Sequence, residues 1–390
     1  MSDHSFVPYG RHEITKDDID SVTEVLKSDF LTQGPKLPMF ERSVIDACDV
    51  AFAVASNSAT SSLHLACLAL DVGPGDVVWT SPVSFVASAN CALYCGATVD
   101  FVDIDQKTFN MSVDALSAKL KEADAKGVLP KTVIPVHLAG QSCDMEAIHA
   151  LAQRYGFSII EDASHAIGGA YKDEPVGNCR FSDICVFSFH PVKIVTTAEG
   201  GIATTQSADL ARRMEMLRSH GITRDQELMT HESDGPWYYQ QLDLGWNYRM
   251  TEMQAALGTS QMGRIEDFIN RRHQIVQRYQ ELLEDLPISR PFQNSDTRSS
   301  FHLYIIQIEF DNVDKTHRNI FDELRGHKIG VNLHYIPIHL QPYYEKLGFS
   351  SGMFPNAEEY YGRSISIPLF HSMTNRQQDR VVSALHAVLN

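Results

Sequence analysis

The sequence predicts an α/β protein with a large, mostly parallel mixed sheet, helices on both faces of that sheet, and a smaller C-terminal α+β domain. Two observations lead to this prediction. From about residue 51 to residue 205, short apolar runs alternate with helical stretches, as in successive strand–helix units. The apolar runs are also continuous, which is typical of parallel strands that are buried on both faces.

Two helices are expected ahead of this alternating region. Thr15 is a suitable N-cap, acidic residues occupy positions 17–18, and an apolar stripe follows over residues 19–26. A break rich in turn-forming residues at Leu31–Pro35 separates this helix from a second one over Met39–Cys48.

The alternating region itself supplies seven strands and at least four helices. We expect the strands at Ala53–Ala55, Val77–Thr80, Thr98–Val102, Thr132–His137, Ser158–Glu161, Ile184–Ser188 and Gly201–Thr204. The expected helices are Ser61–Leu70, Phe85–Tyr94, Met145–Tyr155 and Asp209–Ser219.

The sequence pattern changes in the remainder of the chain. A long helical stretch is broken at Pro287, and shorter elements follow it. We place a domain boundary inside the long helix, with the N-terminal segment and large domain at 1–260 and the smaller domain at 261–390. The expected elements are a helix at Thr251–Leu286, an alternating strand at His302–Phe310, a helix at Thr316–His327, a strand at Gly330–Tyr335 and a helix from Asn375.

Composition narrows the class of protein. The 390 residues carry 33 Lys and Arg against 49 Asp and Glu, and a net charge of −16 argues against nucleic acid as a partner. No apolar run approaches the roughly 18 residues of a membrane span, and residues 1–11 show no signal peptide. The seven cysteines include no CxxC pair, which is typical of reduced thiols. We expect a cytoplasmic enzyme that binds no membrane.

The common phosphate-loop, dinucleotide and metalloprotease motifs are missing from the sequence. Cys91 and Cys95 lie four residues apart on one expected helix, a spacing that suits a metal ion. With no third ligand close in sequence, we interpret both as small core residues and expect no metal site.

Two strand ends carry the residues that suggest chemistry. Asp162 follows an apolar strand at the edge where open α/β sheets bind ligands. Lys193 follows a second buried strand and is a candidate Schiff-base lysine, because burial lowers the pKa of an amine and makes it nucleophilic. The alternatives are a helix cap or turn residue for Asp162 and a solvated loop lysine for Lys193.

A third feature is the run of small hydroxyl residues at Ser56–Ser61. At a helix start such residues leave backbone N–H groups free for an anion, although an ordinary N-cap is the alternative. Together the three features are consistent with pyridoxal 5′-phosphate (PLP). Its phosphate would lie at the Ser58–Ser61 turn, its pyridine nitrogen at Asp162 and its aldehyde carbon at Lys193.

At these residues the sequence resembles the DegT-type, PLP-dependent sugar-nucleotide aminotransferases, which have aminotransferase fold type I. The resemblance covers nearly the whole chain, and its nine motifs occur in the order found in the family. They are Leu31–Gly34, Asn57–Ser61, Ser84–Ser88, Glu161–His165, Phe187–Lys193, Thr197–Gly201, Arg218–Gly221, Asn247–Arg249 and His334–Pro337.

The resemblance implies catalytic roles for two residues. Lys193 matches the lysine that forms the Schiff base and, once released, moves a proton, and Asp162 matches the carboxylate that keeps the pyridine nitrogen protonated. The other implied cofactor contacts are His165 near the phenolic oxygen, Phe85 stacked on the ring, Ala59, Thr60 and Ser188 at the phosphate, and Asn247 at the phosphate of the other subunit. For Phe85 an ordinary core position is the alternative.

The resemblance also implies a sugar-nucleotide cleft and a homodimer with shared active sites. The matching cleft residues are Tyr9, Asp29, Phe30, Leu31, Thr32, His334 and Tyr335. Arg249 is a candidate for an anionic group of the substrate or amino donor, with a surface ion pair as the alternative. A purely structural role is the alternative for Tyr9 and Tyr335.

Within the family, the motifs are most similar to the branch that acts in pseudaminic acid biosynthesis. That branch implies transfer of an amino group from L-glutamate, which leaves 2-oxoglutarate, to carbon 4 of UDP-2-acetamido-2,6-dideoxy-β-L-arabino-hex-4-ulose. Pro191 and Val192 depart from the branch's pattern. The alternatives are another nucleotide-linked 4-keto-6-deoxy sugar, of the bacillosamine or GDP-linked perosamine type, or a PLP-binding protein without turnover. A dehydrating sister branch has His at the position of Lys193, which argues against that branch.

Overall fold

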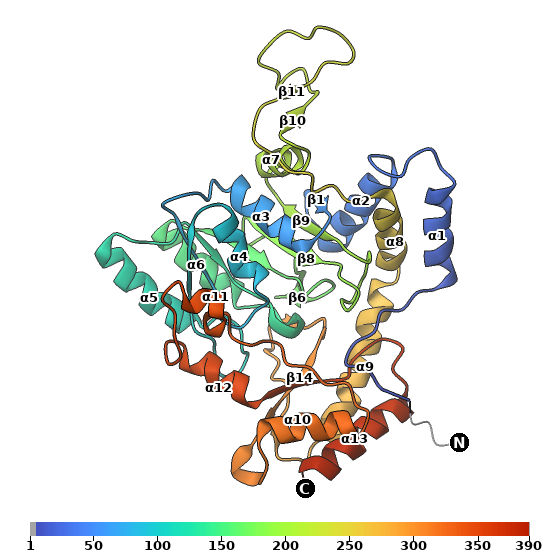
Figure 1. The fold of residues 1–390 in the computed structure, drawn as a ribbon, viewed down its shortest axis with the longest axis vertical. Helices are drawn as coiled ribbons and strands as arrows, with labels where there is room; N and C mark the ends of the chain where they lie inside the picture. The colour runs from blue at the N-terminus through green and yellow to red at the C-terminus, as the bar shows by residue number, and fades with distance from the viewer. Residues whose placement is uncertain (1–4, 390) are drawn as a thin grey trace.

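The structure is a computed structural model that describes residues 5–389. Its centre is a seven-stranded sheet with the order β1-β9-β8-β5-β4-β2-β3 (Figure 1). The strands are β1 (Phe52–Ser56), β2 (Val77–Thr80), β3 (Thr98–Phe101), β4 (Thr132–Ile134), β5 (Ser158–Asp162), β8 (Ile184–Ser188) and β9 (Gly201–Thr205). All seven expected strands therefore occur, and all lie in one sheet.

The sheet is mostly parallel, as expected. Strands β3, β2, β4, β5 and β8 pair in parallel, whereas β9 is antiparallel to both β8 and β1. Strand β4 ends at Ile134, three residues before the expected end. Pro135 follows it and has no N–H group to donate, so the regular ladder stops there.

Helices cover both faces of this sheet because successive side chains of each strand point in opposite directions. Val54 of β1 and Ile160 of β5 pack with α3, α4 and α7. Ala55 of β1 packs on the other face with α2 and α8, and Ile159 of β5 packs there with α5 and α6. The helices are α2 (Lys36–Cys48), α3 (Ala59–Ala69), α4 (Ala87–Tyr94), α5 (Val113–Lys126), α6 (Met145–Tyr155), α7 (Ala208–Arg218) and α8 (Glu252–Met262).

The expected helix at Thr251–Leu286 is in fact two helices, α8 and α9 (Ile265–Leu282). The break falls at Gly263 and Arg264, where the backbone of Arg264 leaves helical geometry. Its guanidinium reaches the buried Asp18 at 2.7 Å. Ser260 and Gln261 donate to the same carboxylate, so the break is tied to the docking of α1 (Lys16–Leu26) on α8.

The C-terminal region has its own three-stranded antiparallel sheet with the order β12-β14-β15. Strand β14 belongs to two cores, because Ile305 packs with the large-sheet cluster and Ile306 with the C-terminal cluster. This explains why all of its residues are buried, where an alternating strand was expected. The domain boundary at residue 260 stays a prediction. The elements are β12 (Ile288–Ser289), β14 (Tyr304–Ile308), α10 (His317–Gly326), α12 (Pro355–Arg363), β15 (Ser364–Ile367) and α13 (Asn375–Leu389).

The expectation of a strand at Gly330–Tyr335 is wrong. This segment makes a single bridge to the sheet, between Asn332 and Ser366. At its start, the Gly330 N–H donates to the Val7 carbonyl, and the Val7 N–H donates to the Lys328 carbonyl, so this part of the chain pairs with the N-terminal segment. The side chains of residues 332–335 line a cavity. The segment therefore forms a cavity wall and not a strand of a sheet.

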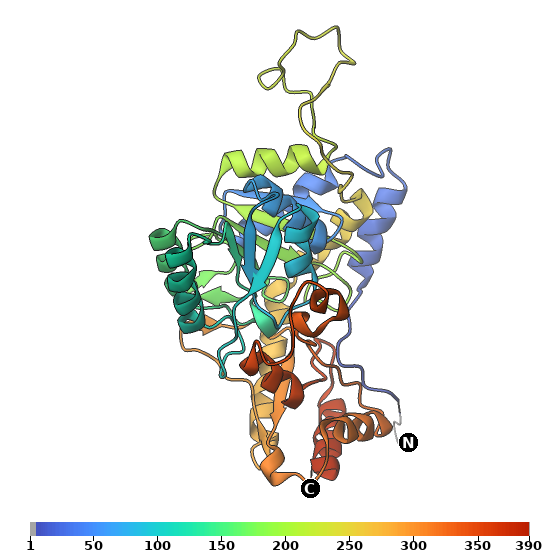
Figure 2. The ribbon, with the colours of Figure 1, turned by 60° about the vertical axis from the view of Figure 1, so that its left-hand side comes forward.

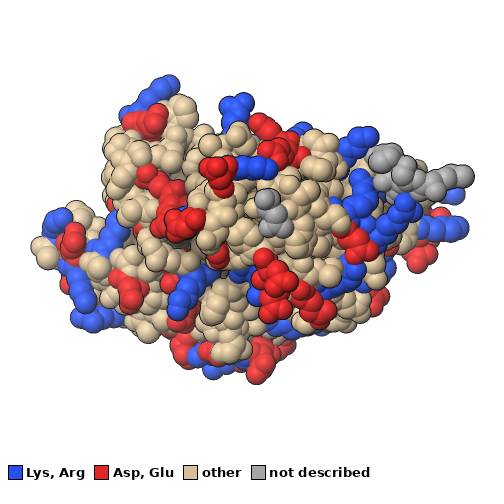
Figure 3. All heavy atoms as spheres, turned by 90° about the horizontal axis from the view of Figure 1, so that it is seen from below, with Lys and Arg blue, Asp and Glu red and all other residues tan. Residues whose placement is uncertain are grey.

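An arm stands away from the body between β10 (Ile222–Thr223) and β11 (Gln240–Gln241), as Figures 1 and 2 both show. It carries exposed apolar side chains, among them Trp237 at 72% exposure. On the face seen in Figure 3, acidic and basic side chains are interspersed. Among residues 5–389, no helix is both long enough and apolar enough to span a membrane.

Candidate active site

A cavity of about 530 Å³ lies where the parallel strands β5 and β8 end. The start of α3, the loop before α4 and the segment 332–335 complete its wall. The residues expected at the site that line this cavity are Tyr9, Ala59, Thr60, Phe85, Asp162, His165, Ser188, Lys193, His334 and Tyr335.

Lys193 lies in the loop that joins β8 to β9. Its backbone N–H donates to the His190 carbonyl at 2.9 Å, and the Thr197 N–H closes the loop on the Phe189 carbonyl at 3.0 Å. Burial lowers the pKa of the Lys193 amine to about 8, and the nearby charge of Asp162 opposes this effect only in part. A shift from 10.5 to about 8 means that the charged form has lost about 3 kcal/mol relative to the neutral amine.

Asp162 ends β5 and is almost fully buried. Its carboxylate accepts hydrogen bonds from the Ser88 hydroxyl at 2.5 Å, the Ser164 N–H at 3.1 Å and the Ser164 hydroxyl at 2.6 Å. Donors to both oxygens fix the orientation of this carboxylate. The site thus holds a fixed negative charge beside an amine that loses its proton easily.

The first turn of α3 provides an anion site at the same edge of the sheet. Ser58 caps the helix by accepting the Ser61 N–H at 3.1 Å, whereas the N–H groups of Ala59 and Thr60 have no hydrogen-bond partner within residues 5–389. A Cβ atom at Gly201 would lie 2.4 Å from the Ala59 nitrogen. Strand β9 can therefore approach this turn only because residue 201 is glycine.

Two histidines of the cavity wall have both ring nitrogens engaged. The Ala139 N–H donates to His165 Nδ1 at 3.2 Å, so Nε2 carries the proton and bonds the Tyr335 hydroxyl at 3.0 Å. In His334, Asn332 donates to Nε2 at 3.3 Å and Nδ1 bonds Ser366 at 2.8 Å. Burial holds the pKa of His165 well below its usual range and lowers that of His334 to about 3. Both imidazoles are therefore neutral at physiological pH.

Phe85 is 58% exposed, although it belongs to the cavity wall. An ordinary core position, the alternative considered for it, does not fit this exposure. Its ring lies 6.2 Å from that of Tyr335, and the two rings are tilted by 56°. An exposed aromatic face over a cavity is available for stacking on a flat ligand.

The remaining expected residues do not line the cavity of their own chain. Thr32 forms a bridge with Thr251, near the start of α8. Asn247 is exposed and pairs with Ser219 at the base of the arm. The residues outside the wall are Asp29, Phe30, Leu31, Thr32, Asn247 and Arg249.

Three residues of the site had no role in the sequence analysis. Ser164 follows Asp162 by two positions, and the local pattern Asp-x-Ser signals a side chain that folds back on the carboxylate. Ser88 and His302 come from segments that only the tertiary fold brings to Asp162 and His165. Within residues 5–389, no group of three His, Cys, Asp or Glu side chains has the arrangement of a metal site.

These features of the chain itself fit PLP. Free amides at a helix start suit its phosphate, an exposed aromatic face suits its ring, a buried carboxylate suits its pyridine nitrogen, and an amine of lowered pKa suits its aldehyde. Each of these groups faces the same cavity.

Comparison with known proteins agrees with this fit. A sequence model of the DegT/DnrJ/EryC1/StrS aminotransferase family matches residues 12–386. The spore coat polysaccharide biosynthesis protein SpsC of Bacillus subtilis is 39% identical over 389 residues, which cover 98% of this chain and 97% of SpsC.

Solved structures give the same result. Helicobacter pylori PseC, described as an aminotransferase of pseudaminic acid biosynthesis, superposes with a TM-score of 0.90 at 29% identity, and 99% of each chain is covered. The PLP form of a putative sugar aminotransferase of Streptococcus pneumoniae gives a TM-score of 0.86 at 29% identity, with 99% of this chain and 100% of that chain covered. The fold is thus that of the type I aminotransferases.

The lowered pKa of Lys193 predicts how PLP capture by the cofactor-free protein depends on pH. Only the neutral amine attacks an aldehyde, and with a pKa of about 8 about one tenth of Lys193 is neutral at pH 7. The capture rate, followed by absorbance, should rise roughly tenfold from pH 6 to pH 7 and level off above pH 8.

An Asp162→Asn variant gives the control for this prediction. Removing the carboxylate takes away the charge that raises the pKa of Lys193, so the profile should move to lower pH. A rate that keeps climbing beyond pH 9 in the wild type would show that Lys193 behaves as an ordinary solvated amine.

Proposed function

Since the chain belongs to the DegT/DnrJ/EryC1/StrS aminotransferase family and is a PLP-dependent sugar aminotransferase, we propose that it transfers an amino group from L-glutamate to carbon 4 of a UDP-linked 4-keto-6-deoxy-N-acetylhexosamine. The specific substrate proposed is UDP-2-acetamido-2,6-dideoxy-β-L-arabino-hex-4-ulose. The observation that carries the reaction type is the juxtaposition of Lys193 and Asp162 in one cavity. The likeness to PseC supports the choice of sugar.

In this proposal Lys193 links to the cofactor and later moves the proton. When bound, PLP supplies an electron-withdrawing ring that stabilises negative charge on the carbon that loses a proton. Lys193, with a pKa near 8, accepts and returns a proton at neutral pH. Asp162 accepts a hydrogen bond from the protonated ring nitrogen, and Ser88 and Ser164 fix its orientation.

Other residues of the wall bind and orient the cofactor. The amides of Ala59 and Thr60 and the hydroxyl of Ser188 hold the phosphate, and Phe85 stacks on the ring. His165 would lie beside the phenolic oxygen, and its neutral Nε2–H group is kept in place by the contact with Tyr335. Because His165 stays neutral, Lys193, with its pKa near 8, is the group that moves a proton.

The rest of the wall suits a neutral sugar. Tyr9, His334 and Tyr335 present aromatic rings and hydrogen-bonding groups without charge. Lys193 is the only Lys or Arg in the wall among residues 5–389, while Asp162 and Glu199 are both acidic. A diphosphate and the carboxylates of a glutamate donor therefore require cations from outside this chain's own cavity.

We propose that a second copy of the chain supplies those groups in a homodimer with shared active sites. Asn247 and Arg249 flank the base of the arm, outside their own cavity. Trp237 of the arm and Leu244, just after β11, are each 72% exposed, which is unusual for large apolar side chains that stay in water. In an isologous dimer, Asn247 of each subunit reaches the phosphate site of the other and Arg249 meets an anionic group of the substrate or donor.

A second candidate substrate follows from the relatives. SpsC is 39% identical to this chain, against 29% for PseC, and its name refers to a spore coat polysaccharide. Another nucleotide-linked 4-keto-6-deoxy sugar, of the bacillosamine or perosamine type, is therefore the alternative. In either case the chain works in the cytoplasm, where nucleotide sugars and reduced thiols are found.

A substrate panel tests the proposed function. Purified protein with PLP and glutamate is offered UDP- and GDP-linked 4-keto-6-deoxy sugars, and amino-sugar products are measured by mass spectrometry. We expect the highest kcat/KM for the UDP-linked N-acetyl sugar named above, with stoichiometric 2-oxoglutarate. Preference for a GDP-linked or a differently configured sugar would overturn the choice of substrate, and no amination of any sugar would overturn the reaction.

Subunit mixing tests the shared site. Lys193→Ala and Asn247→Ala subunits, each nearly inactive alone, are mixed and allowed to exchange. In the mixed dimer both lesions fall in one site and the other site is intact, so about a quarter of the wild-type activity should return.

The matched control mixes Lys193→Ala with Asp162→Asn. Both residues lie in the cavity of their own chain, so no intact site can form and activity should stay low. If the first mixture stays as inactive as this control although mass spectrometry shows subunit exchange, Asn247 acts within its own subunit.

A further inference from the structure

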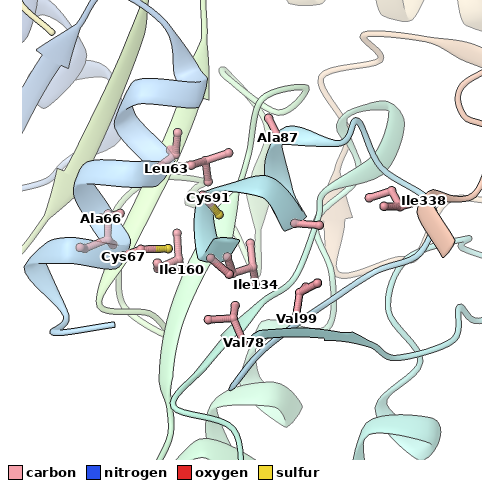
Figure 4. Close-up of a cluster of buried hydrophobic side chains, with 14 of the residues drawn as sticks. Leu63, Ala66, Cys67, Val78, Ala87, Cys91, Val99, Ile134, Ile160 and Ile338 are labelled. Carbon is pink, nitrogen blue, oxygen red and sulfur yellow. The ribbon is translucent and has the colours of Figure 1, made fainter. Parts of the chain in front are cut away.

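Three of the seven cysteines gather with a histidine between α3 and α4. His64 and Cys67 are three residues apart on α3, and Cys91 and Cys95 are four residues apart at α4 and its C-cap. These spacings place each pair on one side of its helix. The two helices pack together in the cluster of Figure 4, where Cys67 and Cys91 both lie among the buried apolar side chains.

Cys67 is the central thiol of the group. Its thiol lies near enough to Cys91 and Cys95 for both to affect its pKa, and it is fully buried. Cys67 and Cys95 are therefore neighbours where α3 packs on α4, and a disulfide between them requires Cβ atoms about 4 Å apart.

Cys95 differs from the other cysteines in its exposure. All seven cysteines fall within residues 5–389, and six of them are buried while Cys95 is partly exposed. A small oxidant from solvent therefore meets Cys95 first. The same contact with solvent distinguishes Cys95 from Cys91, its neighbour on α4.

His64 is placed to act on Cys95. Its Nδ1 lies 3.1 Å from the Tyr248 hydroxyl, while its buried Nε2 has no hydrogen-bond partner in the part of the chain that the structure describes. When Tyr248 donates to Nδ1, the proton of the ring lies on Nε2 and is free to be shared with the Cys95 sulfur. The rings of Tyr94 and Trp246, at 5.6 Å and 4.8 Å, hold the imidazole in this position.

The pKa values of the Cys95 and Cys67 thiols are shifted in opposite directions. The hydrogen bond from Cys67 and the neighbouring His64 hold the pKa of the Cys95 thiol below its usual range, against the effect of partial burial. The neighbouring thiols of Cys91 and Cys95, together with burial, hold the pKa of Cys67 well above its usual range. Partial exposure and a lowered pKa together make Cys95 the thiol that reacts first with an oxidant in solvent, and the buried Cys67 the one that follows. The C-terminal end of α4 works against negative charge on Cys95.

We propose that Cys95 and Cys67 form a peroxide-sensitive thiol pair, in which Cys95 is attacked first and Cys67 closes a disulfide between α3 and α4. The Cys95 thiolate attacks one oxygen of hydrogen peroxide, breaks the O–O bond and becomes a sulfenic acid, while hydroxide leaves and takes up a proton. The Cys67 sulfur then attacks the Cys95 sulfur and displaces a second water molecule. Two thiols and one peroxide thus yield one disulfide and two waters.

The pair lies next to the active site without belonging to it. Helix α3 begins with the amides of Ala59 and Thr60, and α4 carries Ser88, which holds Asp162. Cys67 and Cys95 do not line the cavity. A Cys95→Ser variant should therefore keep its aminotransferase activity, and the oxidised bond should be reversible by dithiothreitol.

Peptide mapping of the intact PLP-loaded protein tests the proposal. Trypsin is unsuitable, because no Lys or Arg occurs between residues 43 and 106 and one peptide would hold both cysteines. Cleavage before aspartate separates residues 49–70, which contain Cys67, from residues 76–99, which contain Cys91 and Cys95. After one equivalent of hydrogen peroxide and alkylation of the remaining thiols, these two fragments should be linked, with the alkyl group on Cys91.

Single substitutions give the controls. Cys91→Ser should still form the linked fragments, whereas Cys95→Ser should form none. In Cys67→Ser, the sulfenic acid on Cys95 should persist and be trapped by dimedone. A link from Cys67 to Cys91, or fragments that stay unlinked in the wild type while another cysteine is oxidised, would overturn the proposal.

A kinetic readout separates activation by His64 from simple exposure. At pH 7, iodoacetamide should alkylate Cys95 at least about tenfold faster than it alkylates the other cysteines of the folded protein. His64→Gln should slow this alkylation, while His149→Gln, a change on the distant helix α6, should not. Equal rates for wild type and His64→Gln would show that His64 does not activate the thiol.

Discussion

The structure depends on one electrostatic arrangement, the amine of Lys193 in a poorly solvated cavity opposite the carboxylate of Asp162. Burial favours the neutral amine and the nearby carboxylate offsets only part of that effect, so the net result favours the neutral amine by about 3 kcal/mol. The imidazoles of His165 and His334 are kept neutral by the same burial, so they add no positive charge that would repel a protonated amine. As a result, Lys193 changes its protonation state near neutral pH.

The fold creates this arrangement through strand order. Strands β5 and β8 are parallel neighbours, and Asp162 pairs in register with Val186. Ser188 and the Lys193 loop therefore begin roughly 6–7 Å beyond Asp162 along the strand direction, at the same edge of the sheet. Gly201 lets β9 contact the first turn of α3, which brings the free amides of Ala59 and Thr60 to that edge as well.

Much of this organisation could be predicted because local sequence patterns indicate it. Continuous apolar runs marked all seven strands, and the residues that follow two of them, Asp162 and Lys193, face the cavity as expected. Contacts between distant segments were not predictable. The break at Gly263 accompanies an ion pair of Arg264 with Asp18. Residues 332–335 form a cavity wall instead of a strand, and Ser88 reaches Asp162 only through the packing of α4. Asn247 lies outside its own cavity, so the phosphate contact proposed for it would come from a second chain, which no local pattern describes.

The most direct test of the central role of Lys193 is to fix the cofactor where it binds. PLP-loaded protein is reduced with borohydride, digested with trypsin and analysed by mass spectrometry. Modification of Lys193 blocks cleavage there, so the account predicts one peptide spanning residues 181–212 that carries the reduced cofactor. Lys193→Ala should bind PLP through the α3 turn and Asp162 but yield no covalent adduct. A reduced adduct on any other lysine, or an adduct that persists in Lys193→Ala, would contradict the account.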